Sequence, residues 1–262
     1  MYREISNAYC VGKLSNNSSL PEFIATHENF DEWYNSTAFV TANKKHYNKM
    51  YHTFGSAEDQ TIFCKYYLQK QFAEKLYDGF TRSSRAQRAH ERICKMQELG
   101  VSTPDSLGYL RSQSRSYLFL QVIDGFNDLR HYQESPDTHN QLPLHTLIDK
   151  TLEQLVRMHN NGYCHGDFKW PNILLNESSG EIMVIDFDGV RYQPSRKLPQ
   201  SYIKDVARFL VSCKEGGLAD EHVDYVLKTY AQMRELRVET IEHAIKPRYE
   251  EIIQKHARKR LR

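Results

Sequence analysis

The clearest pattern in the chain is a stripe of apolar residues at helical spacing between residues 144 and 158. Such a stripe predicts a helix with one buried face, and Asn161-Gly162 supplies the stop that often ends a helix. A second stripe predicts a helix from Ser83 to Leu99, which Gly100 ends. The apolar positions are Leu144, Leu147, Ile148, Leu152, Leu155 and Met158 in the first helix and Ala86, Ala89, Ile93 and Met96 in the second.

Apolar runs of strand-like composition lie mainly in the first half of the chain. They predict strands at 36–42, 49–54 and 61–67, and 117–125 is predicted to be a buried strand that leads into a glycine turn. Residues 1–35 are polar and aromatic, so neither an element nor any chemistry is assigned to them, and Leu20-Pro21 indicates a break. Near the end of the chain, helices are predicted at about 220–236 and 238–257.

One stretch joins polar groups to apolar runs in a way that indicates chemistry. It is His165-Gly166-Asp167-Phe168-Lys169-Trp170-Pro171-Asn172, followed by a predicted hairpin of Ile173-Leu174-Leu175 and Met183-Val184-Ile185-Asp186. Phosphoryl transfer from ATP to a hydroxyl needs a carboxylate near that hydroxyl and oxygen ligands that hold Mg²⁺ against the phosphates. Asp167 supplies the carboxylate, Asn172 lies at the spacing of the kinase metal ligand, and the hairpin returns Asp186 beside Asn172. The stretch therefore predicts the active centre of a phosphotransferase.

The alternative is a set of ordinary loop residues on an unrelated α/β domain. A bare Asp-x-x-x-x-Asn motif carries little information. The combination is more specific, because a helix, the loop, a hairpin and a second aspartate follow one another in the required order. We therefore favour the phosphotransferase.

The loop has a mixed form that resembles two groups of kinases. His165-Gly166-Asp167 is similar to the loop of small-molecule kinases of the aminoglycoside-kinase type, whereas Lys169 is the protein-kinase form. With Asp186-Phe187-Asp188 in place of Asp-Phe-Gly, the mixture resembles the lipopolysaccharide-core kinases, the bacterial family that phosphorylates Kdo or heptose sugars. The resemblance extends from about Phe63 to about Gly216.

This resemblance implies a fold, cofactors and residue roles. The fold is a two-lobed, protein-kinase-like α+β fold, with a small antiparallel-sheet lobe and its N-terminal extension over 1–122. A mainly helical large lobe over 123–262 carries the catalytic loop. ATP and Mg²⁺ are the implied cofactors. Asp167 is then the catalytic base, Lys169 neutralises charge during transfer, and the metal ligands are Asn172 and Asp186.

The third predicted strand contains Lys65 among apolar and aromatic neighbours. Because a buried ammonium group is unfavourable unless it meets an anion, Lys65 is predicted to contact the α- and β-phosphates of ATP. An outward-facing strand lysine is the alternative. Glu91 is the predicted partner that orients Lys65, as a helix glutamate does in protein kinases, although Glu98 lies on the same helix.

Two segments concern how the nucleotide is held. The resemblance places Gln121, Val122 and Ile123 at the interlobe hinge, where main-chain groups meet adenine, and a plain core strand is the alternative. Segment 43–48 joins two predicted strands without a glycine, whereas kinases usually cover the phosphates with a glycine-rich loop. The phosphate contacts of that segment stay open, and so does an inactive pseudokinase.

Three more residues near the loop are assigned structural roles. His159 is predicted to pack in the core, because a histidine on an apolar helix face is more often buried than a ligand. His165 is predicted to hold the loop through hydrogen bonds. Asp205 is predicted to brace the catalytic loop.

Charge and cysteine content narrow the class of protein. Lysine plus arginine number 35 against 33 acidic residues, a net charge of +2, so nothing global indicates nucleic-acid binding. The five cysteines form no C-x-x-C pair, which suits a reducing cytosol. Because no segment approaches the ~18 apolar residues of a membrane span, a cytoplasmic protein is expected. The basic tail 258–262 suggests peripheral contact with the anionic inner membrane.

The sequence thus predicts an ATP-dependent kinase that phosphorylates a heptose or Kdo hydroxyl of the lipopolysaccharide inner core. A serine/threonine protein kinase is the first alternative, and Lys169 is suggestive of it. An antibiotic kinase follows, supported by His-Gly-Asp but without an acidic drug-binding run. From a different class, a nucleotide-sensing or scaffold pseudokinase stays open.

Overall fold

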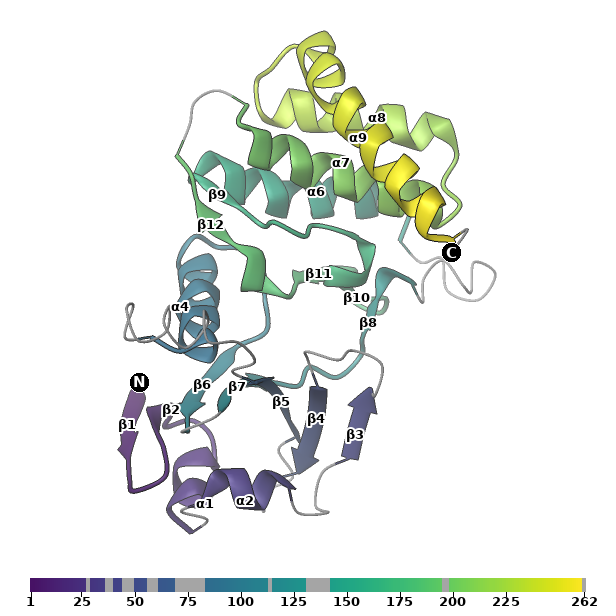
Figure 1. Ribbon diagram of the computed structural model, residues 1–262. Coiled ribbons are helices and arrows are strands. Elements are labelled where there is room, and N and C mark those ends of the chain that lie inside the picture. Colours follow the sequence, from purple (N-terminus) through teal and green to yellow (C-terminus); the bar gives the residue numbers. More distant parts are fainter. Residues whose placement is uncertain are drawn as a thin grey trace. The chain divides into compact units, whose positions relative to one another are not determined.

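The computed structural model divides the chain into two compact units, residues 1–95 with 104–123 and residues 96–103 with 124–262 (Figure 1). The residues it describes are 1–26, 29–35, 40–43, 50–55, 61–68, 83–112, 115–130, 142–194 and 198–260. Sequence analysis assigned segment 96–103 to the small lobe. In the structure this segment joins the second unit, because Ser102 accepts a hydrogen bond from the Val184 N–H at 2.8 Å and donates one to Gln154 at 2.8 Å.

The first unit, which we call the sheet unit, contains a seven-stranded sheet whose neighbouring strands are all antiparallel. The strand order is β1-β2-β6-β7-β5-β4-β3. The bounds are β1 Tyr2–Ser6, β2 Val11–Ser15, β3 Val40–Asn43, β4 Met50–Gly55, β5 Thr61–Leu68, β6 Ser106–Arg111 and β7 Arg115–Gln121. Among the described residues, its helices are α1 Leu20–Thr26, α2 Phe30–Asn35 and the longer α4 Arg85–Glu98, whose last residues belong to the second unit. The strands predicted at 49–54 and 61–67 and the helix predicted at 83–99 are confirmed within one or two residues at each end.

Residues 1–35, to which no element was assigned from the sequence, form two strands and two short helices in the described part of the chain. The first two strands form a hairpin at one edge of the sheet, with Tyr2 opposite Ser15, and β2 pairs with β6. Two short helices follow. Pro21 does not break the chain but lies at the second position of α1, where its missing N–H would have no helical partner in any case.

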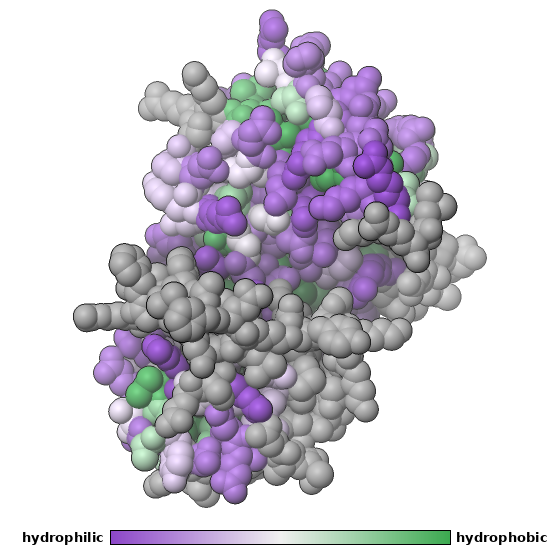
Figure 2. Space-filling view, viewed as in Figure 1, coloured by the Kyte–Doolittle hydropathy of each residue, from purple (hydrophilic) through white to green (hydrophobic). Residues whose placement is uncertain are grey.

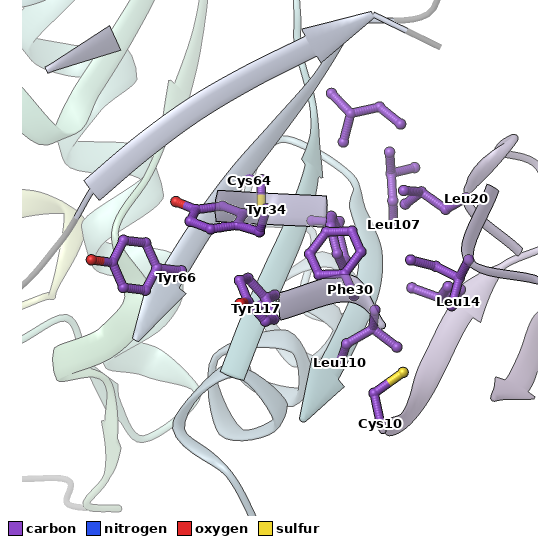
Figure 3. Close-up of a cluster of buried hydrophobic side chains, with 13 residues drawn as sticks. Cys10, Leu14, Leu20, Phe30, Tyr34, Cys64, Tyr66, Leu107, Leu110 and Tyr117 are labelled. Carbon is purple, nitrogen blue, oxygen red and sulfur yellow. The ribbon is translucent and has the colours of Figure 1, made fainter. Parts of the chain in front are cut away.

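Aromatic residues fix α2 on the sheet, as Figure 3 shows. Phe30 and Tyr34 both stand against the ring of Tyr117, with centroids 4.8 and 5.1 Å away. Between them Asp31 accepts a hydrogen bond from the Tyr117 hydroxyl at 2.6 Å, which satisfies the polar end of an otherwise buried ring. The surrounding cluster is completed by Cys10, Leu14, Leu20, Ile24, Ile62, Cys64, Tyr66, Leu107, Leu110 and Phe119.

The second unit, the helical unit, is mainly α-helical, as predicted. Its helices are α6 Leu144–Asn160, α7 Gln200–Glu215, α8 Asp220–Met233 and α9 Val238–Arg260. Its strands are β8 Phe126–Asp128, β10 Ile173–Asn176 and β11 Glu181–Val184 in one sheet, and β9 Tyr163–Cys164 with β12 Arg191–Tyr192 in another. The predicted apolar stripe of α6 is buried at Leu147, Ile148, Leu152, Leu155 and Met158.

Helix α9 lies along α7 and α8 (Figure 1), and its outward face is mainly hydrophilic in the view of Figure 2. The helix therefore covers the rest of the unit with its apolar side and meets water with its polar side. Among the described residues, no helix has both the length and the apolar composition that crossing a membrane requires.

Candidate active site

One face of helix α7 holds the catalytic loop in place. The carboxylate of Asp205, which is fully buried, accepts the N–H of His165 at 2.6 Å and the N–H of Gly166 at 2.8 Å. Seven residues later on the same helix, the Ser212 hydroxyl accepts the N–H of Trp170 at 3.1 Å. Positions i and i+7 share a helix face, so α7 binds the loop main chain at two points. The predicted bracing role of Asp205 is confirmed.

Gly166 is required by the shape of this loop. Its φ of +85° lies in the left-handed region, and a Cβ atom there would stand 2.6 Å from the carbonyl oxygen of Gly189. A side chain at position 166 would therefore push apart the loop and the segment after Asp186. This contact explains why the second position of the motif is glycine in this chain.

The hairpin brings Asn172 and Asp186 together. Strands β10 and β11 pair with Ile173 opposite Val184, and the next N–H, that of Ile185, donates to the carbonyl of Asn172 at 2.9 Å. Asn172 is nearly buried, and its Nδ2 donates to the main-chain carbonyl of Asp167 at 2.8 Å. The loop and the hairpin therefore place Asp167, Asn172 and Asp186 in one site, as their spacing predicted.

Asp186 has a left-handed backbone, with φ 67° and ψ 58°. Such a conformation is unfavourable for a residue other than glycine, and it persists only where the surroundings fix it. Here Ile185 is bonded on both sides, because its carbonyl accepts from His165 Nε2 at 3.1 Å. The buried ring of Phe187 follows directly. Asp186 thus occupies a strained backbone position directly after the hairpin.

Two cations contact the Asp167 carboxylate. Lys169 Nζ lies 2.9 Å from Oδ2, and Arg208 of α7 contacts Oδ1. Partial burial lowers the pKa of Lys169, while the negative charge of Asp186 acts in the opposite direction. Lys169 therefore feels both carboxylates of the site. Sequence analysis missed Arg208, although its position three residues after Asp205 places it on the helix face that holds the loop.

The two histidines behave as predicted. His165 is fully buried, accepts the N–H of Asp167 on Nδ1 at 3.3 Å and uses Nε2 for Ile185. His159 stacks on Tyr202 with ring centroids 4.0 Å apart and hydrogen-bonds Tyr230 at 2.7 Å. Burial is the main cause that lowers the pKa of each. Neutral imidazoles fit these roles, because they pack and orient rather than carry charge.

In the sheet unit, Lys65 lies inside β5 and is only 4% exposed. It pairs with Leu118 of β7 and Tyr51 of β4 in the middle of the sheet. Its ammonium group stands 5.4 Å from the centre of the Tyr67 ring. The burial excludes the outward-facing strand lysine considered above.

Glu91 does not have the expected contact. Its side chain is exposed, and Oε1 accepts a hydrogen bond from Gln87 at 2.9 Å. Among the described residues, Glu91 forms no ion pair with Lys65. The reason is the orientation of α4, whose buried positions include Ala89 and Ile93, while Glu91 lies between them on the outward side.

The predicted hinge residues Gln121, Val122 and Ile123 differ in whether their main-chain groups are already hydrogen-bonded. The N–H of Gln121 is already used, because it donates to the carbonyl of Asp105 at 2.9 Å. Val122 and Ile123 are half-buried, and their main-chain groups form no hydrogen bond with the described part of the chain. No other group of the described chain therefore competes with a ligand for them. Segment 44–49, which holds most of the glycine-free loop, lies outside the described residues.

Comparison with known proteins identifies the family. The family model described as the lipopolysaccharide kinase (Kdo/WaaP) family matches residues 13–230. The chain belongs to the lipopolysaccharide kinase (Kdo/WaaP) family. This match extends well beyond the stretch that carried the resemblance, and it covers both Lys65 and Asp186. The two-lobed, protein-kinase-like α+β fold predicted from the resemblance is confirmed.

Individual relatives are more distant. The chain is 26% identical over 129 residues to the EKC/KEOPS complex subunit bud32 of Dictyostelium discoideum, a match of 48% of this chain and 49% of that protein. It is 27% identical over 115 residues to the probable serine/threonine-protein kinase YbdM of Bacillus subtilis (strain 168), covering 40% and 43%. The chain thus spans about half the length, or less, of these curated relatives.

The donor set of this Kdo/WaaP family member fits Mg²⁺. Hard oxygen ligands suit this ion, which commonly takes one or two protein ligands and completes its shell with phosphates and water. Asn172 uses Nδ2 for Asp167, and its Oδ1 accepts no hydrogen bond within the described chain. Asp186 is fixed next to it. No grouping of three or more His, Cys, Asp or Glu ligands occurs among the described residues.

Proposed function

We propose that this protein is an ATP-dependent phosphotransferase that phosphorylates a sugar hydroxyl, of heptose or Kdo, in the lipopolysaccharide inner core. Membership of the Kdo/WaaP family supports the kinase and the class of acceptor. The observation that carries the proposal is the convergence of Asp167, Asn172 and Asp186, which the Ile185–Asn172 and Asn172–Asp167 hydrogen bonds bring together.

Asp167 acts on the acceptor. Its carboxylate is 28% exposed, so a hydroxyl from solvent can approach it. Asp167 orients that hydroxyl in line with the γ-phosphate and takes its proton as the new P–O bond forms and the bond to the leaving ADP oxygen breaks. Lys169 balances the negative charge that moves toward the transferred group.

Nucleotide contacts are proposed for residues of each unit. Lys65 is proposed to contact the α- and β-phosphates, and the free main-chain groups of Val122 and Ile123 to meet adenine. Asn172 and Asp186 would hold Mg²⁺, which when bound neutralises phosphate charge. The exposed Glu91 takes no part in this proposal, because it pairs with Gln87 instead.

A second candidate is a serine/threonine protein kinase. The observation in its favour is the 2.9 Å contact between Lys169 and Asp167, because a lysine two residues after the aspartate is the protein-kinase form of the loop. The name of one relative, a probable serine/threonine-protein kinase, points the same way. Both candidates use the same loop, so only the acceptor separates them.

Transfer of labelled γ-phosphate from ATP tests the proposal. The purified chain is incubated with Mg²⁺ and either dephosphorylated lipopolysaccharide core or a generic protein, with Asp167→Ala as the control. We expect label in the glycolipid with the wild type and none with the variant. Label in protein alone would replace the proposal with the protein kinase. Absence of transfer to every acceptor, despite nucleotide binding, would indicate a pseudokinase.

We also propose that the protein acts in the cytoplasm, with peripheral contact to the anionic inner face of the bacterial inner membrane and without a nucleic-acid partner. Arg258 near the C-terminus is exposed and belongs to a basic run in the sequence. Anionic lipid attracts such residues by about 1 kcal/mol each. Flotation with anionic vesicles should be weaker for a chain truncated after His256, and equal flotation would refute the contact.

A further inference from the structure

Arg208 has more binding capacity than its contact with Asp167 uses. A guanidinium group carries five N–H donors, and within the described chain Arg208 pairs only with Asp167. Its side chain is 35% exposed. Partial burial lowers the pKa of Arg208, and the positive charge of Arg248 lowers it further. A second cation therefore faces the one that touches the catalytic carboxylate.

Arg248 lies on the side of α9 that packs against α7. Ile241 and Ile245 of α9 are buried, and Arg248 occupies the next position of the same stripe. Further along, His256 of α9 lies 3.0 Å from the carboxylate of Glu215 at the end of α7. Arg208 and Arg248 each come about two turns before these partners, so both belong to the seam between the two helices.

The donors of Arg248 are not all satisfied. One terminal nitrogen pairs with the exposed carboxylate of Glu251, one turn along the helix. The Nε–H is buried and has no acceptor among the described residues. A buried donor without an acceptor is destabilising, and it is rare unless a ligand or water supplies the missing oxygen. The seam thus contains Arg208, which contacts the Asp167 carboxylate, and Arg248, which has an unused donor.

We propose that Arg208 and Arg248 form an anion subsite that binds a carboxylate or phosphate group of the acceptor and thereby places the acceptor hydroxyl at Asp167. This proposal rests on the proposed function and names the chemistry of its acceptor. Arginine suits the role, since its planar fork binds both oxygens of such a group and orients it. Arg208 contacts both the base and the bound anion, so one side chain would set the distance between them.

The subsite faces the acceptor rather than the nucleotide. Arg208 touches Asp167, the group that meets the incoming hydroxyl, whereas Asn172 and Asp186 form the metal side of the site. Lys169 lies between the two carboxylates. We therefore expect loss of the subsite to change the KM for the acceptor and to leave the KM for ATP unchanged.

Arg248→Gln in the chain of residues 1–262 tests the subsite, and Arg237→Gln, an exposed arginine directly before the same helix, is the matched control. With inner-core acceptor, we expect Arg248→Gln to raise the acceptor KM at least about 10-fold, with kcat within about threefold and thermal stability unchanged. The control should match the wild type. An unchanged acceptor KM, or a rise in the KM for ATP alone, would overturn the proposal.

Modified acceptors identify the bound group. The test is repeated with acceptor whose sugar carboxylate is converted to the methyl ester, and with acceptor whose phosphates are removed. The modified acceptor that has lost the group bound by the arginines should have the same KM with the wild type and with Arg248→Gln. If the difference persists with both modified forms, the arginines do not bind the acceptor. Inorganic phosphate should compete with the acceptor for the wild type and not for the variant.

Binding of the intact acceptor without ATP separates this proposal from the proposed function. If the wild type transfers no phosphate but binds the acceptor at least 10-fold more tightly than Arg248→Gln, the kinase assignment fails and the subsite stands. If transfer occurs and both proteins bind equally, the subsite fails and the kinase assignment stands.

Discussion

The loop around Asp167 and the strand around Lys65 hold their charged groups in opposite ways. Asp167 is partly exposed and is contacted by Lys169 and Arg208, and hydrogen bonds to α7 fix its loop. Lys65 is buried in the middle of a sheet, next to the ring of Tyr67. The loop depends on a few directional bonds, and the strand depends on packing. Substitutions in the two regions should therefore differ in how much they change activity and how much they change the free energy of unfolding.

The largest effect is expected for Asp167→Asn. The amide keeps the size of the side chain but accepts no proton, so kcat should fall by about 10³-fold or more. Because the carboxylate is partly exposed and solvent weakens its ion pairs, the melting temperature should stay within about 2 °C. Steady-state kinetics and thermal unfolding check both parts. Activity within tenfold of the wild type would remove Asp167 from the chemistry.

Asp205→Asn tests the support of the same loop. The buried carboxylate accepts two main-chain N–H groups, and an amide group replaces one acceptor with a donor. We expect a loss of about 3 kcal/mol in the free energy of unfolding, together with most of the activity. Urea unfolding gives the first value and phosphate transfer the second. A stable but inactive Asp205→Asn would show that the residue acts on the substrate rather than on the loop.

Acid should weaken both regions through buried histidines. Burial lowers the pKa of His159 and His165 in the helical unit, and lowers the pKa of His90 in the sheet unit to about 4. The unfolded chain then binds more protons than the folded one, so stability is retained above about pH 6.5 and is lost as the pH falls. His90 alone would contribute a loss of about 3 kcal/mol by pH 4.

Urea unfolding between pH 7.5 and pH 4 measures this dependence, and His90→Gln should flatten it. Hydrogen exchange at each pH assigns the loss to the sheet unit or the helical unit. If the free energy of unfolding stays constant as the pH is lowered from 6.5 to 4, the histidines are not neutral in the folded protein as assigned.

The smallest effect concerns the nucleotide, and a pair of variants in the sheet unit measures it. Lys65→Met should raise the KM for ATP or lower kcat by about 10- to 100-fold, because it removes the positive charge that is proposed to contact the phosphates. Glu91→Gln should change either value less than twofold, since Glu91 is exposed and bonded to Gln87. Equal losses in both variants would restore the predicted Lys65–Glu91 pair.

Distance along the sequence explains which site residues could be predicted and which could not. Asp167, Asn172 and Asp186 are joined by a short loop and a hairpin, so their spacing predicted that they meet. Glu91 was placed by analogy across a long stretch of chain, and its orientation depends on which face of α4 is buried. Arg208 was missed because its partner is 41 residues away in the sequence. The β1–β2 hairpin was missed because its strands are short and largely exposed, so they lack the apolar alternation of a half-buried strand.

The contact of Gly166 with Gly189 also limits how this site can be rebuilt. Two segments of the main chain lie directly against each other here, and no side chain lies between them that could adjust its position. An engineer who exchanges the loop for the His-Arg-Asp form of protein kinases would have to exchange the segment after Asp186 as well. The loop that contains Gly166 and the segment that contains Gly189 must therefore be exchanged together. A chimera that takes them from two different enzymes should be inactive, even when both parent enzymes are active.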